Sequence, residues 1–466
     1  MIKKYALHLL SIVILVLLFG VYLISQNETN KITKIIKDNT PTQIKQLLKK
    51  TLFYIPLKIR EYKEIKKAFY ELNDKNLELI TENNVLKNQL YQGDYDKNVK
   101  GEYIFQSFVV PFISDDDPYK RKSQAYLEIY KEKIIIIFWS GKILYLDKDN
   151  FDKEISLFTE IKNNLIKENF FNNSIKWTGV RDALVVDDVI YLSLAEEIKK
   201  DCYMTSVIKA NLNFENLEFS SVFKPKECTD ISNQVDSFKY FNGHQTGGRL
   251  VWLDEKIYLT IGDYNSWEYV QDNKSVIGKI LEIDPNTESY RIISKGHRNQ
   301  QGLAIFSQKE KLLISSEHGP KGGDEINIID LKRNLKTNNF GWPIASYGEH
   351  YDVVPINKYT KKYAPLHKSH KGYGFQEPIK FFPKAVAPSQ IIKNYFTNEN
   401  QFILSSLGKE SLFFLEIDNS KNVKLVNTID TGERIRDIIY DKFTNSYFIY
   451  QEKTNTPKIV KISKIK

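Results

Sequence analysis

The pattern of apolar and polar residues divides the chain into three parts. Residues 5–25 form an apolar run that contains no Lys, Arg, Asp or Glu. Residues 65–90 repeat apolar side chains at heptad spacing, and beyond Gly101 the apolar positions follow a strand-like period. The pattern therefore predicts a membrane-inserting segment, a helical stalk and a β-rich domain, in this order along the chain.

The first apolar run is long enough to cross a membrane once, because about 20 residues in a helix span the hydrocarbon core. Lys3 and Lys4 precede it and favour a cytoplasmic N-terminus. A cleaved signal peptide is the alternative, but the run ends in Tyr-Leu-Ile-Ser-Gln-Asn, without a small-x-small site. We expect an uncleaved signal anchor over residues 1–26. The chain would then be a single-pass membrane protein with everything from Gln26 onward periplasmic or extracellular.

Residues 27–95 are interpreted as a helical stalk that is interrupted at Pro56. One seam position of its heptads carries Ile65, Leu72, Leu79 and Leu86, and the other carries Phe69, Asn76, Asn83 and Leu90. Leucine at one seam position with asparagine at the other favours a parallel, dimeric coiled coil, which would make the protein a homodimer. A single amphipathic helix lying on the membrane or on the β-rich domain is the alternative.

Six apolar runs that end in small or polar residues follow one another between residues 101 and 466. They cover residues 133–139, 188–194, 256–263, 311–317, 401–407 and 446–450, at spacings of about 45 to 90 residues. Units of this length, each with several short strands, predict an all-β fold, a six-bladed β-propeller over residues 101–466. Residues 351–376 lie in the longest gap and are expected to form an extended loop over one face.

Composition narrows the classes of partner. The aromatic content of 13% suits a β-rich protein. The net charge of +9 is spread along the whole chain rather than clustered on one element, so we expect no nucleic-acid partner. Cys202 and Cys228 both lie in the part expected outside the cytoplasm, where they could form a disulfide or remain as two buried thiols.

Three segments in series carry the candidate chemistry. They read Gly296-His-Arg-Asn-Gln-Gln-Gly-Leu303, Glu317-His-Gly-Pro-Lys-Gly-Gly-Asp-Glu-Ile-Asn327 and Asn339-Phe-Gly-Trp-Pro343. In this order they resemble the GHRNPQGL, E(Q/H)GP…DE-N and NYGWP motifs of the quinoprotein glucose/sorbosone dehydrogenases. Members of that family are soluble propellers that oxidise sugars with pyrroloquinoline quinone (PQQ). The resemblance covers residues 185–439, and it implies a sugar substrate, PQQ, calcium and an electron acceptor of the respiratory chain.

Residues 243–251 and 260–263 resemble the catalytic strand pair of the family, H-x-x-G-R-L…T-x-G-D. The resemblance implies that His244 takes the proton of the anomeric hydroxyl while hydride passes from C1 of the sugar to the quinone, and that Asp263 orients His244. In the family the arginine follows the histidine by four residues, whereas Arg249 follows His244 by five. Either a glycine bulges out, or Gln245 occupies the catalytic register, where a neutral amide cannot act as a base.

The resemblance also implies a set of contacts to the carboxylates and ring of PQQ. These residues are Arg298, Asn299, Gln301, Lys409, Arg434 and Arg436. Guanidinium groups bind carboxylates through two hydrogen bonds, and PQQ carries three carboxylates. The lysine is displaced by one position relative to the family pattern.

The calcium ligands implied by the resemblance are Gly319, Pro320, Glu325 and Phe340, the two first and the last through their backbone carbonyls. Calcium prefers oxygen ligands of this kind, and the ion would polarise the quinone.

The sequence thus predicts a membrane-anchored, outward-facing PQQ- and calcium-dependent aldose dehydrogenase. The alternative is a propeller of the same family that has lost catalysis and serves as a ligand-binding or scaffold module. A hydrolase on the same propeller is disfavoured because the chain has no G-x-S-x-G motif.

Overall fold

The computed structural model describes residues 90–92, 94–111, 124–165, 178–231, 244–397, 400–452 and 456–465. The expected anchor and the heptads up to residue 89 lie outside these ranges, so the anchor, the coiled coil and the homodimer stay predictions. Within the described ranges, no helix is long and apolar enough to cross a membrane.

The end of the predicted stalk is strand rather than helix. Strand β1 (Leu90–Gln92) pairs antiparallel with β7 (Leu157–Asn163), and β2 (Tyr95–Lys100) pairs antiparallel with β3 (Tyr103–Val109). The prediction of helix as far as residue 95 is therefore wrong at this end. Most of β2 is exposed, so its sequence carries no buried periodicity, and hydrogen bonding to a neighbouring strand decides its conformation.

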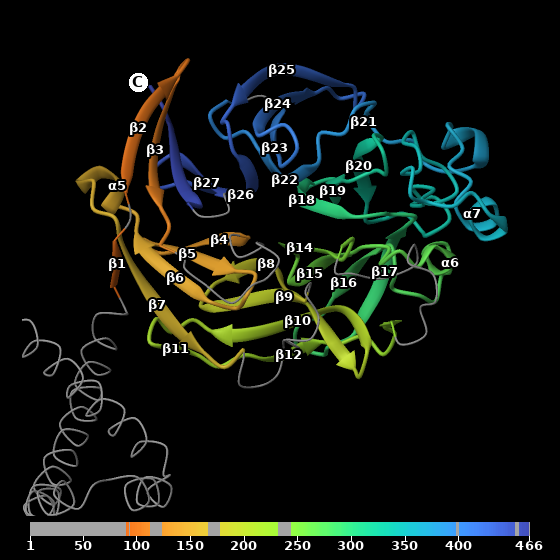
Figure 1. Ribbon diagram of the computed structural model, residues 1–466, viewed down its shortest axis with the longest axis horizontal. Helices are drawn as coiled ribbons and strands as arrows, with labels where there is room; N and C mark the ends of the chain where they lie inside the picture. The colour runs from red at the N-terminus through yellow and green to blue at the C-terminus, as the bar shows by residue number, and fades with distance from the viewer. Residues whose placement is uncertain are drawn as a thin grey trace, which may run out of the picture. The chain divides into compact units, whose positions relative to one another are not determined.

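Six sheets form a closed ring, the predicted six-bladed β-propeller (Figure 1). The innermost strands are β4 (Ala125–Tyr130), β8 (Gly179–Val186), β14 (Gly247–Leu253), β18 (Gln300–Ser307), β22 (Pro388–Lys393) and β26 (Arg434–Asp441). Each innermost strand packs against the innermost strand of the next sheet, and β26 packs against β4, which closes the ring.

The six predicted apolar runs are the second strands of the six sheets. These strands are β5 (Lys133–Phe138), β9 (Val189–Lys199), β15 (Lys256–Ile261), β19 (Leu312–Glu317), β23 (Gln401–Ser406) and β27 (Ser446–Glu452). A second strand has a strand on each side and a neighbouring sheet over each face, so residues of both faces are buried and the run is continuously apolar. This burial explains why the second strands were visible in the sequence.

The outer strands complete each blade. The third strands are β6 (Ile143–Asp147), β10 (Cys202–Asn211), β16 (Lys279–Ile283), β20 (Asp324–Asp330), β24 (Ser411–Ile417) and β28 (Lys458–Lys464). The fourth strands are β7, β12 (Ser220–Phe223), β17 (Tyr290–Lys295), β21 (Lys380–Phe382), β25 (Val423–Asp430) and β3. Short strands β11 (Asn216–Leu217) and β13 (Thr229–Asp230) add to two edges. The last sheet contains an early and a late strand of the propeller, because β3 pairs with β28.

The start of each innermost strand lies beside the end of the second strand. In register, Gly247 faces Ile261, Gln300 faces Glu317, and Arg434 faces Glu452. These starts and ends therefore meet on one face of the ring, which we call the site face. The three motif segments and the residues predicted to contact PQQ lie at or next to these strand ends.

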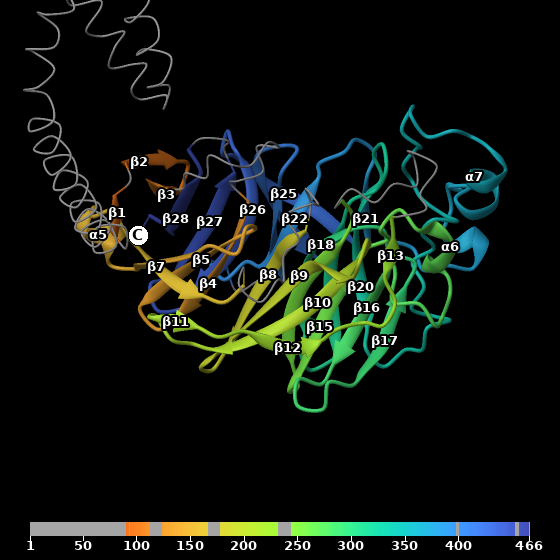
Figure 2. The ribbon, with the colours of Figure 1, turned by 60° about the horizontal axis from the view of Figure 1, so that its bottom comes forward.

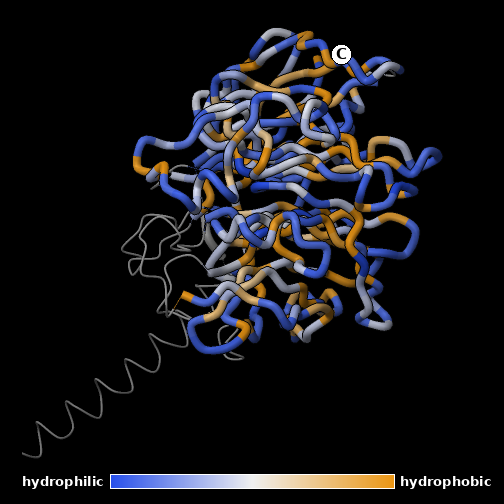
Figure 3. Tube along the Cα trace, turned by 90° about the vertical axis from the view of Figure 1, so that its right-hand side faces the viewer, coloured by the Kyte–Doolittle hydropathy of each residue, from blue (hydrophilic) through white to orange (hydrophobic). Residues whose placement is uncertain are grey.

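Apolar side chains fill the spaces between neighbouring sheets. One cluster joins the last sheet to the first and includes Phe108, Phe138, Phe151 and Phe448, all fully buried. The projecting loops are mostly hydrophilic (Figure 3).

A buried arginine ties the innermost strands together at the centre of the ring. Arg249 on β14 lies 2.8 Å from Asp182 on β8 and 2.7 Å from Asp437 on β26, and it donates to the carbonyl of Arg436 at 3.0 Å. Asp437 also accepts from the backbone N–H of Leu127 on β4 at 2.8 Å. One guanidinium thus connects several blades through paired, buried charges.

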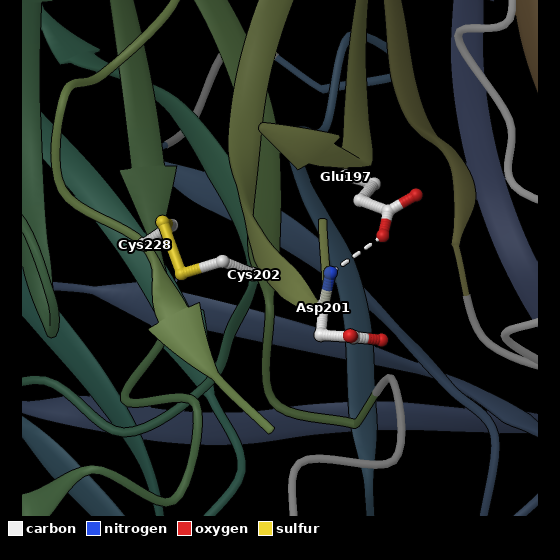
Figure 4. The surroundings of a disulfide bond; sticks show 4 residues. All are labelled: Glu197, Asp201, Cys202 and Cys228. Atoms are coloured by element: carbon white, nitrogen blue, oxygen red, sulfur yellow. Dashed lines mark hydrogen bonds between the residues drawn. A yellow bond between two sulfur atoms is a disulfide. The ribbon is translucent and has the colours of Figure 1, made fainter. Parts of the chain in front are cut away.

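Cys202 and Cys228 are joined by a disulfide with a Cα–Cα distance of 5.4 Å, so the alternative of two thiols does not apply (Figure 4). The bond links the start of β10 to the segment before β13, which pairs with β10. Beside it, the Glu197 carboxylate accepts from the backbone N–H of Asp201 at 2.6 Å and closes the turn between β9 and β10.

The longest connection runs from β20 to β21 and contains the predicted loop. It includes α7 (Lys358–Tyr363) and the 3₁₀ turn η1 (Lys371–Tyr373). In Figure 2, α7 lies beside α6 (Trp267–Val270), and the Tyr359 ring stacks on Trp267 at 6.1 Å. The connection is thereby fixed to the third sheet, and it supplies side chains to the site.

Candidate functional site

Arg298 lies at the start of β18 with its guanidinium turned toward the second motif. Its Nη1 donates to the carbonyls of His318 at 3.1 Å and Gly319 at 2.7 Å. The guanidinium also lies over the Trp342 ring, 5.4 Å from its centre. Arg298 therefore connects all three motif segments, and its buried position matches a role in binding an anion.

Glu317 holds the backbone that presents Arg298. Its Oε2 accepts from the backbone N–H of Arg298 at 2.8 Å, and its Oε1 accepts from Asn327 Nδ2 at 2.7 Å and lies 3.2 Å from His297 Nδ1. The sequence placed Glu317 and Asn327 in a motif but did not indicate that Glu317 orients Arg298. The position of Glu317 could have indicated this role, because a carboxylate at the end of a second strand lies opposite the start of the innermost strand, here β18.

Asp263 follows β15 and is fully buried. Its Oδ2 accepts from Trp342 Nε1 at 2.7 Å, and its Oδ1 accepts from the backbone N–H of Asn265 at 3.0 Å. With the amide of Gln245 oriented to suit its neighbours, the amide nitrogen donates to Asp263 Oδ1 at 2.9 Å and the oxygen accepts from Arg298 at 3.0 Å. Burial raises the pKa of Asp263 to about 6, although the Arg298 charge acts in the opposite direction.

The structure thus brings Gln245 to Asp263, whereas the side chain of His244 is exposed. Strand β14 bulges after Gly247. The same irregularity occurs near the starts of β8, β18, β22 and β26, so the bulge is shared by these innermost strands. It leaves Gln245 beside Asp263, the second of the two arrangements that the spacing allowed.

A chain of hydrogen bonds joins three of the six predicted PQQ contacts. Asn299 Oδ1 accepts from Gln301 Nε2 at 3.1 Å, and Gln301 Oε1 lies 3.4 Å from Arg436 Nη1. Asn299 Oδ1 also accepts from the backbone N–H of Gly247 at 3.2 Å, which links the chain to β14. These residues therefore converge on the site face, from three of the six blades.

Arg434 and Arg436 share one carboxylate, that of Glu452 at the end of β27. Arg436 forms an ion pair with Glu452 Oε1, and Arg434 Nε lies 3.4 Å from Glu452 Oε2. Arg434 also donates to the carbonyl of Leu407 at 3.2 Å. Lys409 lies two residues further along this turn, with an exposed side chain. No sequence motif pointed to Glu452, which compensates part of the charge of the two arginines.

The predicted calcium ligands are already bonded to protein groups. The Gly319 carbonyl accepts from Arg298, and the Pro320 carbonyl lies 3.4 Å from the Tyr351 hydroxyl. His370 lies between the other two, with Nδ1 2.8 Å from the Phe340 carbonyl and Nε2 3.3 Å from Glu325 Oε1.

The charges around these oxygens do not suit a divalent cation in this arrangement. Burial, the largest single effect, opposes a charge on His370, but the Glu325 carboxylate, Glu377 and the Phe340 carbonyl together outweigh it and raise the pKa of the imidazole. Burial raises the pKa of the Glu325 carboxyl, against the lowering effect of His370. Among the described residues, no group of three or more His, Cys, Asp or Glu side chains is arranged to hold a metal ion.

Known proteins match this chain over the region that contains these motifs. The sequence model of the Glucose / Sorbosone dehydrogenase family matches residues 178–460. Aldose sugar dehydrogenase YliI from Escherichia coli is 29% identical over 223 residues, which are 43% of this chain and 55% of that protein. The chain spans about half the length of the curated relatives it matches.

Solved structures share the fold. The soluble aldose sugar dehydrogenase of Escherichia coli in its apo-form superposes with a TM-score of 0.59 at 19% identity, over 77% of this chain and 99% of that one. The PQQ-bound aldose sugar dehydrogenase of Streptomyces coelicolor gives a TM-score of 0.50 at 16% identity, over 79% of this chain and 100% of that one.

Proposed function

The chain belongs to the glucose/sorbosone dehydrogenase family, and on that premise we propose that it is a PQQ-dependent aldose dehydrogenase. The observation that carries the proposal is the convergence of Arg298, Asn299, Gln301 and Arg436 on the site face, beside the buried Asp263. The relatives named above are an aldose sugar dehydrogenase and a PQQ-bound one, which supports the same activity here.

The proposed cofactor fits this set of side chains. Arg298, Arg434 and Arg436 would bind its carboxylates, Asn299 and Gln301 would orient it, and the exposed Lys409 can turn toward it. The carboxylate of Glu452 reduces the positive charge but leaves the cluster cationic. When bound, PQQ would accept the hydride that leaves C1 of the sugar.

His244 is the proposed acceptor of the hydroxyl proton, because it is the titratable residue of this segment and its side chain is exposed. Asp263 does not need His244 as a partner, since both of its oxygens accept hydrogen bonds from Gln245, Asn265 and Trp342. Asp263, which the resemblance implies would orient the base, is instead bonded to Gln245, so we expect the proposed enzyme to be slow. No step of this mechanism involves calcium.

A second function is supported by one observation. The amide of Gln245 lies against Asp263, where the resemblance calls for a base. A propeller with this arrangement can bind a ligand without oxidising it, and it would then act as a ligand-binding or scaffold module.

The test is a titration of the purified full-length protein with PQQ, followed by assays of an aldose panel with an artificial dye as acceptor. We expect saturable PQQ binding and slow dye reduction. Arg298→Ala should weaken PQQ binding roughly 10- to 100-fold, because it removes a charge-assisted hydrogen bond. The control is Arg333→Ala, which removes an exposed arginine paired with Asp330 and should leave binding unchanged.

The outcomes separate the two functions. A protein that does not bind PQQ contradicts the dehydrogenase proposal. PQQ binding without turnover of any aldose supports the binding module instead.

We also propose that the propeller lies outside the cytoplasm, held there by the expected anchor, and passes electrons to an acceptor of the respiratory chain. The uncharged run after Lys3 and Lys4 and the disulfide between Cys202 and Cys228 support this location, because disulfides persist in oxidising compartments.

An impermeant protease added to intact cells should therefore digest the propeller. Alkylation without reduction should leave both cysteines unmodified. A protected propeller with two alkylated cysteines would show that it faces the cytoplasm.

A further inference from the structure

The cavity beside Arg298 is small, about 10 Å³, and is lined by two carboxylates and two basic side chains. The carboxylates are Glu317 and Glu325, and the basic side chains are Arg298 and His370. The basic groups compensate negative charge, so the cavity attracts a further cation only weakly.

His370 is held in this cavity from all sides. Its ring stacks on Tyr347 at 5.2 Å, and its own carbonyl accepts from the backbone N–H groups of Tyr373 and Phe375, both at 3.0 Å. The side chain is 1% exposed. These contacts of the ring and of the backbone hold the imidazole in position.

Both ring nitrogens of His370 face oxygen atoms. Nδ1 lies 2.8 Å from the Phe340 carbonyl, which can only accept, so Nδ1 carries a hydrogen. Nε2 lies 3.3 Å from Glu325 Oε1, although it makes no hydrogen bond of normal geometry. The imidazole ring therefore fills the space between the Phe340 carbonyl and the Glu325 carboxylate, where a cation bound to both would have to lie.

We infer that His370 occupies the place of a divalent cation between Glu325 and the Phe340 carbonyl, so that this half of the predicted calcium set is closed to metal in the natural chain. The imidazole lies against the two oxygens that a metal ion at this position would contact. Removing the imidazole should uncover a carboxylate and a carbonyl that together attract calcium.

The experiment measures binding rather than activity, on the full chain without PQQ. Terbium, a luminescent substitute for calcium, is added and excited through Trp342, which lines the cavity. The Tm is measured in parallel with calcium and with a chelator. The natural chain should show no site that depends on Glu325, and its Tm should be the same in both conditions.

His370→Ala should bind terbium, and calcium in large excess over its Kd should raise the Tm of this variant by about 2 to 4 °C. Adding Glu325→Gln to His370→Ala should abolish both responses. His370→Lys restores a cation and should again be indifferent to calcium. His367→Ala is the matched control, because the His367 ring stacks on Tyr373 at 3.8 Å instead of facing Glu325.

Two results would overturn the inference. One is calcium or terbium binding by the natural chain that Glu325→Gln removes. The other is a folded His370→Ala protein that gains no response to either ion. Binding by the natural chain that persists in Glu325→Gln places the ion elsewhere and agrees with the inference. Because none of these readouts uses PQQ or sugar, they stand or fall separately from the proposed activity.

Discussion

Replacing Gln245 by histidine is expected to raise the turnover of aldose oxidation roughly 10²- to 10⁴-fold, the range that a positioned general base contributes. In the structure the Gln245 side chain lies 2.9 Å from Asp263 Oδ1, so an imidazole on this backbone would have a carboxylate to orient it. Burial raises the pKa of Asp263 to about 6, which still leaves it mostly ionised at neutral pH. The measurement is the kcat of dye reduction with saturating PQQ and sugar.

A double-variant comparison shows which side chain takes the proton. His244→Gln should remove the slow turnover of the natural chain but have little effect when Gln245→His is already present. Fast turnover in the natural chain that His244→Gln abolishes would show that His244 is already well positioned. Unchanged PQQ affinity in all three variants would confirm that only the proton transfer has been altered.

Arg249→Met should lower the free energy of unfolding by about 3–5 kcal/mol, because it leaves two buried carboxylates without their partner. Asp182 and Asp437 are almost fully buried, and they reach Arg249 from two other blades. The change is measured as a shift in the midpoint of denaturation by urea.

The control for this variant is Arg291→Met. Arg291 is half-exposed and pairs with Glu282 on the neighbouring strand of the same sheet, so its loss should cost no more than about 1 kcal/mol. Equal losses in the two variants would show that the central arginine has no special role in holding the blades together.

The sequence predicted the blades because each second strand is buried on both faces. In Lys133–Phe138, the isoleucines and the final phenylalanine are all fully buried, and this gives a continuous apolar run. The fourth strand β25 was not visible for the opposite reason. In Val423–Asp430 nearly all side chains face solvent, so the sequence shows no pattern, and only pairing with β24 makes it a strand.

The motifs identified the residues that meet on the site face, because strand ends of a propeller converge whatever their distance in the sequence. They could not identify Glu452 or His370, which belong to no motif and are brought in by β27 and by the long connection after β20. The choice between His244 and Gln245 also depended on geometry. The spacing allowed two arrangements, and the backbone around the bulge of β14 determined which side chain reaches Asp263.

Closure of the ring by β3 and β28 has a consequence for how the protein is made. The register pairs Val109 with Lys458, so the two strands of this seam are synthesised far apart in time. Until the final strand emerges, β3 and β27 each expose an edge that can pair with another chain. Bringing such distant segments together is entropically costly and slow, so nascent chains would be vulnerable to aggregation late in synthesis. A premature stop before Lys458 would therefore leave an unsealed ring, although every residue of the site face had already been made.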